Sequence, residues 1–157
     1  MGLLLLHQST RLGMVFCATY NIMENTTTCL FIDDDPDDQF IFVETIKKIS
    51  SSITCLLSFN GMEAIAKLLS AQFKPEVIFL DLKMPLMNGL NFLKEKMKHD
   101  VMKHIPVYVL SDYVIWERER ASQFGVWGFI RKPYSLFEWE EALKKVFQFG
   151  MKDRAEI

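Results

Sequence analysis

Five short apolar runs alternate with five helix-like stretches, and this alternation limits the possible fold more than any other feature of the chain. The runs are apolar throughout rather than at every second residue, as expected for strands that helices cover on both faces. They cover residues 28–33, 53–59, 76–81, 105–111 and 126–133. The sequence therefore predicts an α/β fold built on a five-stranded parallel sheet.

The stretches between and after the runs have the apolar spacing and the end signals of amphipathic helices. Pro36 suits a first helical turn, Ser135 suits an amino-terminal cap, and Gly125 and Gly150 suit carboxyl-terminal ends. The connections are short, which leaves no second domain between the elements. The predicted helices cover residues 36–50, 60–73, 89–100, 113–125 and 135–150.

Residues 1–27 do not continue this alternation. The run Leu3–Leu6 is too short to span a bilayer and lacks the basic flank of a signal peptide. We therefore expect residues 1–27 to be an extension of the domain at 28–150, with the native start near Met23. The alternative is an apolar arm that docks on the domain or on a partner. Residues 151–157 are expected to form a carboxyl-terminal tail.

Charge and cysteine content exclude several classes of partner. The net charge of −2 provides no bulk attraction to nucleic acid or to a membrane surface, so we expect neither as a partner. The three cysteines, Cys17, Cys29 and Cys55, match no metal-ligand spacing and no disulfide framework. We therefore expect reduced thiols in a cytoplasmic protein.

Polar side chains follow four of the five predicted strands. In an open parallel sheet, ligands bind beyond the carboxyl ends of the strands. Carboxylates there can hold Mg²⁺, and a lysine and a hydroxyl can bind phosphoryl oxygens. An aspartate can also form an acyl phosphate, and Asp81 is the candidate nucleophile. The residues at these ends are Asp33, Asp34 and Asp35, then Asp81, then Ser111, then Lys132 followed by Pro133.

Four segments give this arrangement a resemblance to a known family: "LFIDDDPDD", "VIFLDLKMPLMNG", "VYVLSD" and "FIRKPYS". With them the chain resembles the receiver domain of two-component response regulators, in particular the stand-alone, chemotaxis-regulator-like members. The resemblance covers residues 28–150. It implies a flavodoxin-like, doubly wound (βα)5 fold with strand order 2-1-3-4-5.

The resemblance also implies roles for the acidic residues. Asp81 corresponds to the phosphorylated aspartate. Asp33 and Asp34 correspond to an acidic pair, of which Asp34 binds Mg²⁺ directly and Asp33 reaches it through water. Asp81 itself and the backbone carbonyl of Lys83 complete the protein ligands of the metal.

Four further residues correspond to the phosphoryl-binding and switching positions of the family. Ser111 matches the hydroxyl that reorients toward the phosphoryl group, and Phe129 matches the aromatic switch residue. Lys132 matches the phosphoryl-binding lysine, with a cis peptide bond to Pro133. Asp112 departs from the small residue usual at its position and is expected to point into solvent.

The function implied by the resemblance is that of a single-domain response regulator. It would accept a phosphoryl group from a sensor histidine kinase or a histidine phosphotransfer protein and signal to a downstream protein. Such a domain is not an enzyme with conventional turnover, because it catalyses only its own phosphorylation and dephosphorylation.

Three alternatives stay open from the sequence. A haloacid-dehalogenase-like phosphatase would use Asp33 as nucleophile and Asp35 as acid/base, but it leaves Asp81 without a role. A calcium loop starting at Asp33 would place Asp38 where the sharp turn needs glycine. A receiver that takes no phosphoryl group and acts as a scaffold is the third.

Overall fold

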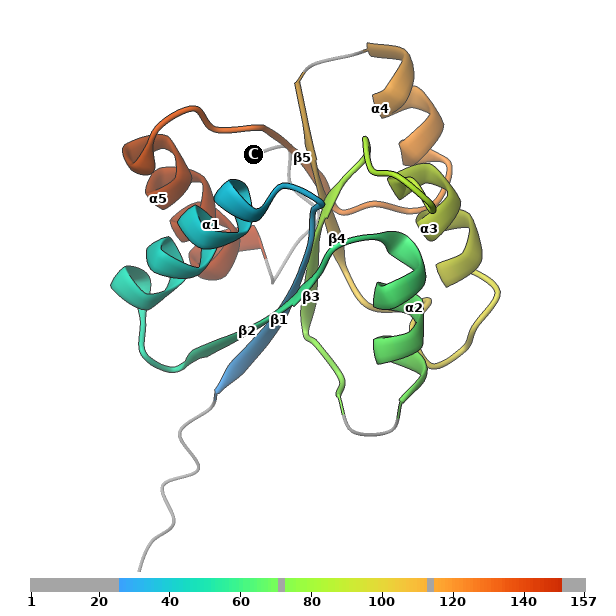
Figure 1. The fold of residues 1–157 in the computed structure, drawn as a ribbon, viewed down its shortest axis with the longest axis horizontal. Helices are drawn as coiled ribbons and strands as arrows, with labels where there is room; N and C mark the ends of the chain where they lie inside the picture. Colours follow the sequence, from blue (N-terminus) through green and yellow to red (C-terminus); the bar gives the residue numbers. More distant parts are fainter. Residues whose placement is uncertain (1–25, 71–72, 113–114, 151–157) are drawn as a thin grey trace, which may run out of the picture.

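The computed structural model describes residues 26–70, 73–112 and 115–150, which form a five-stranded sheet with helices on both faces (Figure 1). Every strand pair is parallel, and the strand order is β2-β1-β3-β4-β5, as predicted. The strands are β1 (Thr27–Ile32), β2 (Ile53–Ser58), β3 (Val77–Asp81), β4 (Val107–Ser111) and β5 (Gly128–Arg131). The helices are α1 (Pro36–Ile49), α2 (Gly61–Leu69), α3 (Gly89–Lys96), α4 (Ile115–Ser122) and α5 (Leu136–Lys145).

Side chains on the strands alternate between two cores, one on each face of the sheet. Figure 1 shows α1 and α5 on one face and α2, α3 and α4 on the other. In β1, Leu30 and Ile32 belong to the core under α2, α3 and α4, whereas Cys29 and Phe31 belong to the core under α1 and α5. This two-sided burial explains why consecutive residues in the inner strands are apolar, as in Cys29–Ile32 of β1 and Val77–Leu80 of β3.

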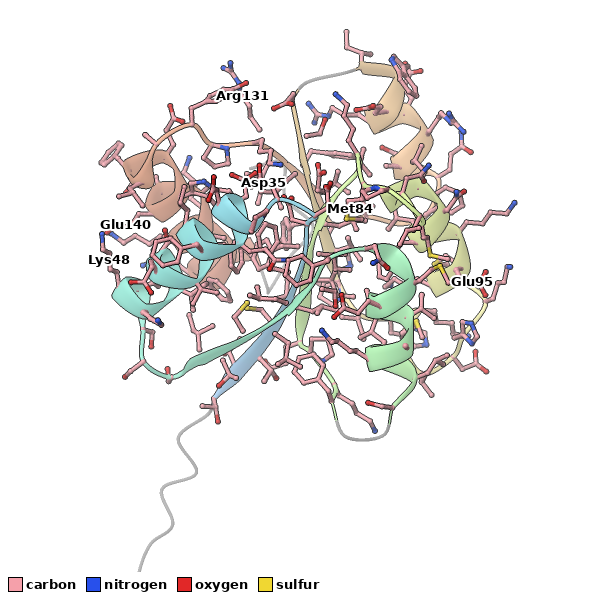
Figure 2. All side chains as sticks on the ribbon, in the orientation of Figure 1. Asp35, Lys48, Met84, Glu95, Arg131 and Glu140 are labelled. Carbon is pink, nitrogen blue, oxygen red and sulfur yellow. The ribbon has the colours of Figure 1, made fainter. Side chains whose placement is uncertain are left out.

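Aromatic side chains fill the core beneath α1 and α5. The Phe31 ring stacks on Phe42 of α1 with 4.2 Å between ring centroids, and Trp139 of α5 contacts both rings edge-on. Each such buried ring stabilises the fold by roughly 1.5–3 kcal/mol through its burial. On the outer surface of the same two helices, Lys48 and Glu140 lie close together (Figure 2).

Four predicted helix starts agree with the structure to within one residue, whereas the start predicted at residue 113 lies outside the described residues. Several helices end earlier than predicted. Asp35 caps α1 by accepting a hydrogen bond from the Asp37 amide at 2.8 Å, and Ser135 caps α5. Gly125 adopts φ 68°, the left-handed conformation that suits glycine in the turn after α4. A π-helical turn over Val146–Gly150 follows α5 directly, so the helical stretch extends to Gly150 as predicted, although its last turn is not α-helical.

The amino terminus of α3 passes very close to the carboxyl end of β3. A Cβ atom on Gly89 would lie 2.5 Å from the Asp81 carbonyl oxygen and 2.8 Å from the Leu82 Cα, so only glycine fits there. The Gly89 amide donates a hydrogen bond to the Leu82 carbonyl at 3.1 Å. This contact ties α3 to the strand end that presents Asp81.

None of the helices in the described ranges is long and apolar enough to cross a membrane. The predicted extension at residues 1–27 lies almost entirely outside the described residues, as do the tail at 151–157 and the predicted native start at Met23.

Candidate functional site

Three carboxylates meet at the carboxyl edge of the sheet. One oxygen from each of Asp33, Asp34 and Asp81 lies within 4.8 Å of the others. The two strands concerned, β1 and β3, are neighbours and pair Ile32 with Leu80, so the residues that follow them come together. Asp33 and Asp81 are buried, whereas Asp34 is exposed. The structure thus brings together the acidic residues that the sequence singled out.

Lys132 directly follows the carboxyl end of β5, and its side chain extends to this cluster. Its Nζ atom lies 3.1 Å from Asp33 Oδ2 and 2.7 Å from Asp38 Oδ2. At 3.1 Å the contact with Asp33 is a close ion pair, so this buried carboxylate oxygen already has one positive partner.

Asp38 is a site residue that the sequence analysis missed. In the sequence it enters only the calcium-loop alternative, although its place in the first turn of α1 also favours the helix dipole. In the structure it shares the Lys132 ammonium with Asp33. The available signal was its helical position: Asp38 follows the cap Asp35 by three residues, which puts it one turn above the strand end.

Gln39 is a second residue that sequence reasoning missed. Its side-chain amide is buried and donates to the Asp33 carbonyl at 2.7 Å and to the Ser58 carbonyl at 3.2 Å. The Asp33 carboxylate is fixed separately, because its Oδ1 accepts a 2.9 Å hydrogen bond from the Asp35 amide. Together these bonds hold the end of β1 against the end of β2.

Burial and neighbouring charges set the ionisation of the site. Burial raises the pKa of the Asp81 carboxyl to about 6; the charge of Lys132 opposes this rise and that of Asp33 adds to it. Burial also raises the pKa of Asp33, against the effects of the Asp35 amide and of Lys132.

For Lys132, burial acts to lower the pKa of the ammonium. The hydrogen bond to Asp38 and the attraction of Asp81 and Asp33 outweigh that effect, so the pKa lies above its usual value. The single Lys132 ammonium thus only partly offsets the negative charge of the buried Asp33 and Asp81 carboxylates. A divalent cation would relieve the remaining repulsion between them.

The loop after β3 orients Asp81. The Lys83 amide donates to Asp81 Oδ2 at 3.2 Å, and the Lys83 side chain is exposed. The role expected for the Lys83 carbonyl remains a prediction. Leu86, further along this loop, has φ 63° and a side chain that is 83% exposed, a strained and open position for a branched residue.

Ser111 and Phe129 lie on the β4 and β5 side of the site. Ser111 is 7% exposed, and within the described part of the chain its Oγ has no hydrogen-bond partner. The half-buried Phe129 ring lies under the Arg118 guanidinium of α4, at 4.7 Å from the ring centroid. A small cavity is lined by all three residues together with Ile130 and Arg131.

Among the remaining sequence predictions, one is wrong and the others agree with the structure. The predicted cis peptide bond before Pro133 is wrong: the described residues contain no cis peptide bond, so Lys132 and Pro133 are joined in trans. The trans isomer is also favoured intrinsically, by about 0.5–1 kcal/mol. Asp112 is exposed, as expected for a carboxylate pointing into solvent. Asp35 stands at the start of α1 (Figure 2) and serves as its cap.

Comparisons with known proteins agree with this arrangement. The model of the response regulator receiver domain matches residues 29–144. The sensor histidine kinase CheAY of Helicobacter pylori is 33% identical over 107 residues, which make up 68% of this chain and only 13% of the kinase. The polar-differentiation response regulator DivK of Brucella anthropi is 27% identical over 116 residues, covering 73% of this chain and 91% of DivK.

Solved structures show the same fold. A two-component response regulator from Legionella pneumophila has 26% identity and a TM-score of 0.67 over 78% of this chain and 99% of its own. The chemotaxis response regulator CheY4 of Vibrio cholerae has 24% identity and a TM-score of 0.66 over 77% of this chain and 98% of its own. The chain therefore belongs to the response regulator receiver domain family, a family of signalling domains.

Proposed function

We propose that this protein is a single-domain response regulator that accepts a phosphoryl group on Asp81 from a histidine-bound phosphoryl donor. The observation that carries the proposal is the meeting of Asp33, Asp34 and Asp81 within 4.8 Å at the strand edge, with Lys132 beside them. The donor would be a sensor histidine kinase or a histidine phosphotransfer protein, and we place the protein in the cytoplasm.

The acidic cluster fits Mg²⁺. It offers three carboxylate oxygens within 4.8 Å of one another, two of them from the buried residues Asp33 and Asp81. Mg²⁺ prefers such oxygen ligands and usually keeps several waters. Asp34 and Asp81 would bind it directly, Asp33 through water, and the Lys83 carbonyl would supply a further ligand. When bound, the ion would offset negative charge on the phosphoryl oxygens.

The residues of the chain have distinct tasks in the transfer. Asp81 Oδ attacks phosphorus in line with the leaving imidazole nitrogen, so that an oxygen–phosphorus bond forms as the nitrogen–phosphorus bond breaks. The Lys83 amide orients the attacking carboxylate from 3.2 Å. Lys132 neutralises charge on the transferred group, because its ammonium has three N–H donors and only two carboxylate partners among the described residues, Asp33 and Asp38.

Switching would follow from the new charge on Asp81. The Ser111 hydroxyl, free of partners in the described part of the chain, can turn to donate to a phosphoryl oxygen. Phe129 would then move into the space that Ser111 leaves, which requires it to part from Arg118. Phosphorylation would thus shift a two-state equilibrium of β4, α4 and β5.

The rim of the site suits a protein partner. Exposed apolar side chains surround the carboxyl edge of the sheet on several loops and helix starts: Phe40, Phe59, Met62, Leu86, Ile115, Trp116, Tyr134, Leu136 and Phe137. Trp139, by contrast, is buried in the core, so of the aromatics on α5 it is Phe137 that could meet a partner.

Acetyl phosphate with Mg²⁺ tests the proposal. Intact mass should show one added phosphoryl group in the wild type and in Asp35→Asn, and none in Asp81→Asn. A phosphoryl group retained in Asp81→Asn would overturn the choice of nucleophile. A wild type that takes none from acetyl phosphate or from a phosphorylated histidine phosphotransfer protein would indicate a non-phosphorylated scaffold instead.

The phosphatase alternative draws no support from the site. It requires Asp35 as acid/base, whereas the Asp35 carboxylate is used as the α1 cap. Turnover of p-nitrophenyl phosphate that is lost in Asp33→Asn and kept in Asp81→Asn would restore it.

A further inference from the structure

Cys29 and Cys55 stand directly opposite one another on neighbouring strands. β1 and β2 run parallel with Cys29 paired to Cys55. Adjacent strands lie about 4.7–4.9 Å apart. Disulfides join residues whose Cα atoms are about 4.4–6.8 Å apart, so the backbone spacing of this pair suits a disulfide.

Both thiols point to the same face of the sheet. Cys29 is fully buried in the core under α1 and α5, and Cys55 packs against that core. Because the two residues are paired in register and both pack in the same core, their thiols are close neighbours. In keeping with this, Cys55 and burial both raise the pKa of the Cys29 thiol.

The two thiols differ in access. Within the described residues, β2 is an edge strand of the sheet and pairs with β1 alone. Cys55 is partly exposed there, and its Sγ lies 3.4 Å from the Leu56 carbonyl oxygen. Cys29, on the strand inside, has no access to solvent. An oxidant would thus meet Cys55 first and Cys29 only through Cys55.

We propose that Cys29 and Cys55 form a reversible intramolecular disulfide when the protein meets a hydroperoxide. The Cys55 sulfur attacks the peroxide oxygen and becomes a sulfenic acid, with release of one water from hydrogen peroxide. The Cys29 sulfur then attacks the Cys55 sulfur, the hydroxyl leaves as a second water with the thiol proton, and the disulfide results. A dithiol reductant returns both thiols by exchange.

The cross-link would join the edge strand to the strand that ends at Asp33 and Asp34. As the edge strand of the sheet that the described residues form, β2 can adjust its position to close the sulfur–sulfur bond. The proposal does not depend on phosphorylation of Asp81, since neither sulfur belongs to the acidic site.

The test uses the full chain with Cys17→Ser, so that only the two strand cysteines remain. The folded protein is treated with hydrogen peroxide, unfolded, and alkylated with N-ethylmaleimide before intact-mass measurement. We expect that neither cysteine is alkylated and that the mass is lower by two hydrogen atoms than that of the reduced, unalkylated protein. Dithiothreitol should restore alkylation of both cysteines. Peptide mapping should join the segments containing Cys29 and Cys55.

Two controls separate this reaction from oxidation of single thiols. With Cys55→Ser added, Cys29 should stay reduced and alkylatable, because it is buried. With Cys29→Ala added, Cys55 should stop at the sulfenic acid or oxidise further, with gain of oxygen mass. The extent of disulfide formation should also be independent of protein concentration, because both cysteines belong to one chain. Oxygen gain without cross-linking in the two-cysteine protein, or a disulfide between two chains, would overturn the proposal.

Discussion

At the scale of single residues, burial gives Asp81 two properties at once. It raises the pKa of the carboxyl to about 6, and it makes the charged form costly to the folded state at neutral pH. The folded state binds more protons than the unfolded state between pH 3.8 and about 6, so this residue's contribution to stability falls as pH rises through that window.

Asp81→Asn should therefore stabilise the metal-free protein above pH 6. We expect a gain of about 1–3 kcal/mol in the free energy of unfolding, which shrinks as pH falls and disappears below pH 4. Urea denaturation in a chelator at several pH values measures it. Asp112→Asn, an exposed carboxylate beside the same site, should show no comparable gain. A gain that does not change with pH would contradict the charge argument.

The pair Asp37 and Asp38 offers a matched comparison of two carboxylates in one helical turn. Both lie in the first turn of α1, but only Asp38 binds Lys132. Asp38→Asn should lower the free energy of unfolding by about 1–2 kcal/mol more than Asp37→Asn, since both lose the same helix-dipole contribution. Chemical denaturation at neutral pH measures the difference. Equal losses would mean that the Lys132–Asp38 pair contributes nothing.

At the scale of elements, the start of α3 has no space for any side chain at its first residue. Gly89→Ala would place a methyl group against the backbone of Asp81 and Leu82, which cannot move aside as a side chain can. We expect a loss of about 1–3 kcal/mol in the free energy of unfolding, together with slower phosphorylation by acetyl phosphate. Asn91→Ala, at an exposed position two residues further along α3, is the control and should keep both properties.

The elements show clearly what could be predicted from the sequence. The five parallel strands and the polar residues at their ends were predictable, because apolar runs mark buried strands and the ends of parallel strands share one edge. The strand order came from the family resemblance and not from the apolar runs. The first and last residues of the strands were harder to predict. For example, β5 was predicted over 126–133 but covers Gly128–Arg131. Trp127 lies before the strand and donates its amide to the Val107 carbonyl, a contact that apolar character alone does not distinguish from pairing.

Contacts between distant residues were beyond sequence reasoning. The sharing of Lys132 by Asp38 and Asp33 depends on how far α1 stands from β5, and the Arg118–Phe129 contact depends on where α4 packs. Gln39 looks like any polar helix residue until the backbone places it between two carbonyl groups. The isomer of the Lys132–Pro133 bond is likewise decided by the local backbone path.

At the scale of the whole molecule, Mg²⁺ and folding should be linked. A ligand that binds only the folded state adds about 2.7 kcal/mol of stability at one hundred times its dissociation constant. We expect Mg²⁺ to raise the thermal midpoint of the wild type and of Asp35→Asn, in which asparagine still caps α1. Asp34→Asn should lose most of the increase. An equal Mg²⁺ effect in both variants would place the ion elsewhere.

The order of the site residues along the chain has a consequence for protein synthesis. The acidic cluster is encoded in β1 and β3, but the ammonium that balances it comes with Lys132 after β5. A nascent chain that has reached only β4 holds the carboxylates without their counter-charge. The arrangement on which the proposed phosphoryl acceptance depends is therefore complete only when Lys132 has been synthesised, and a fragment that ends before Lys132 would lack this counter-charge.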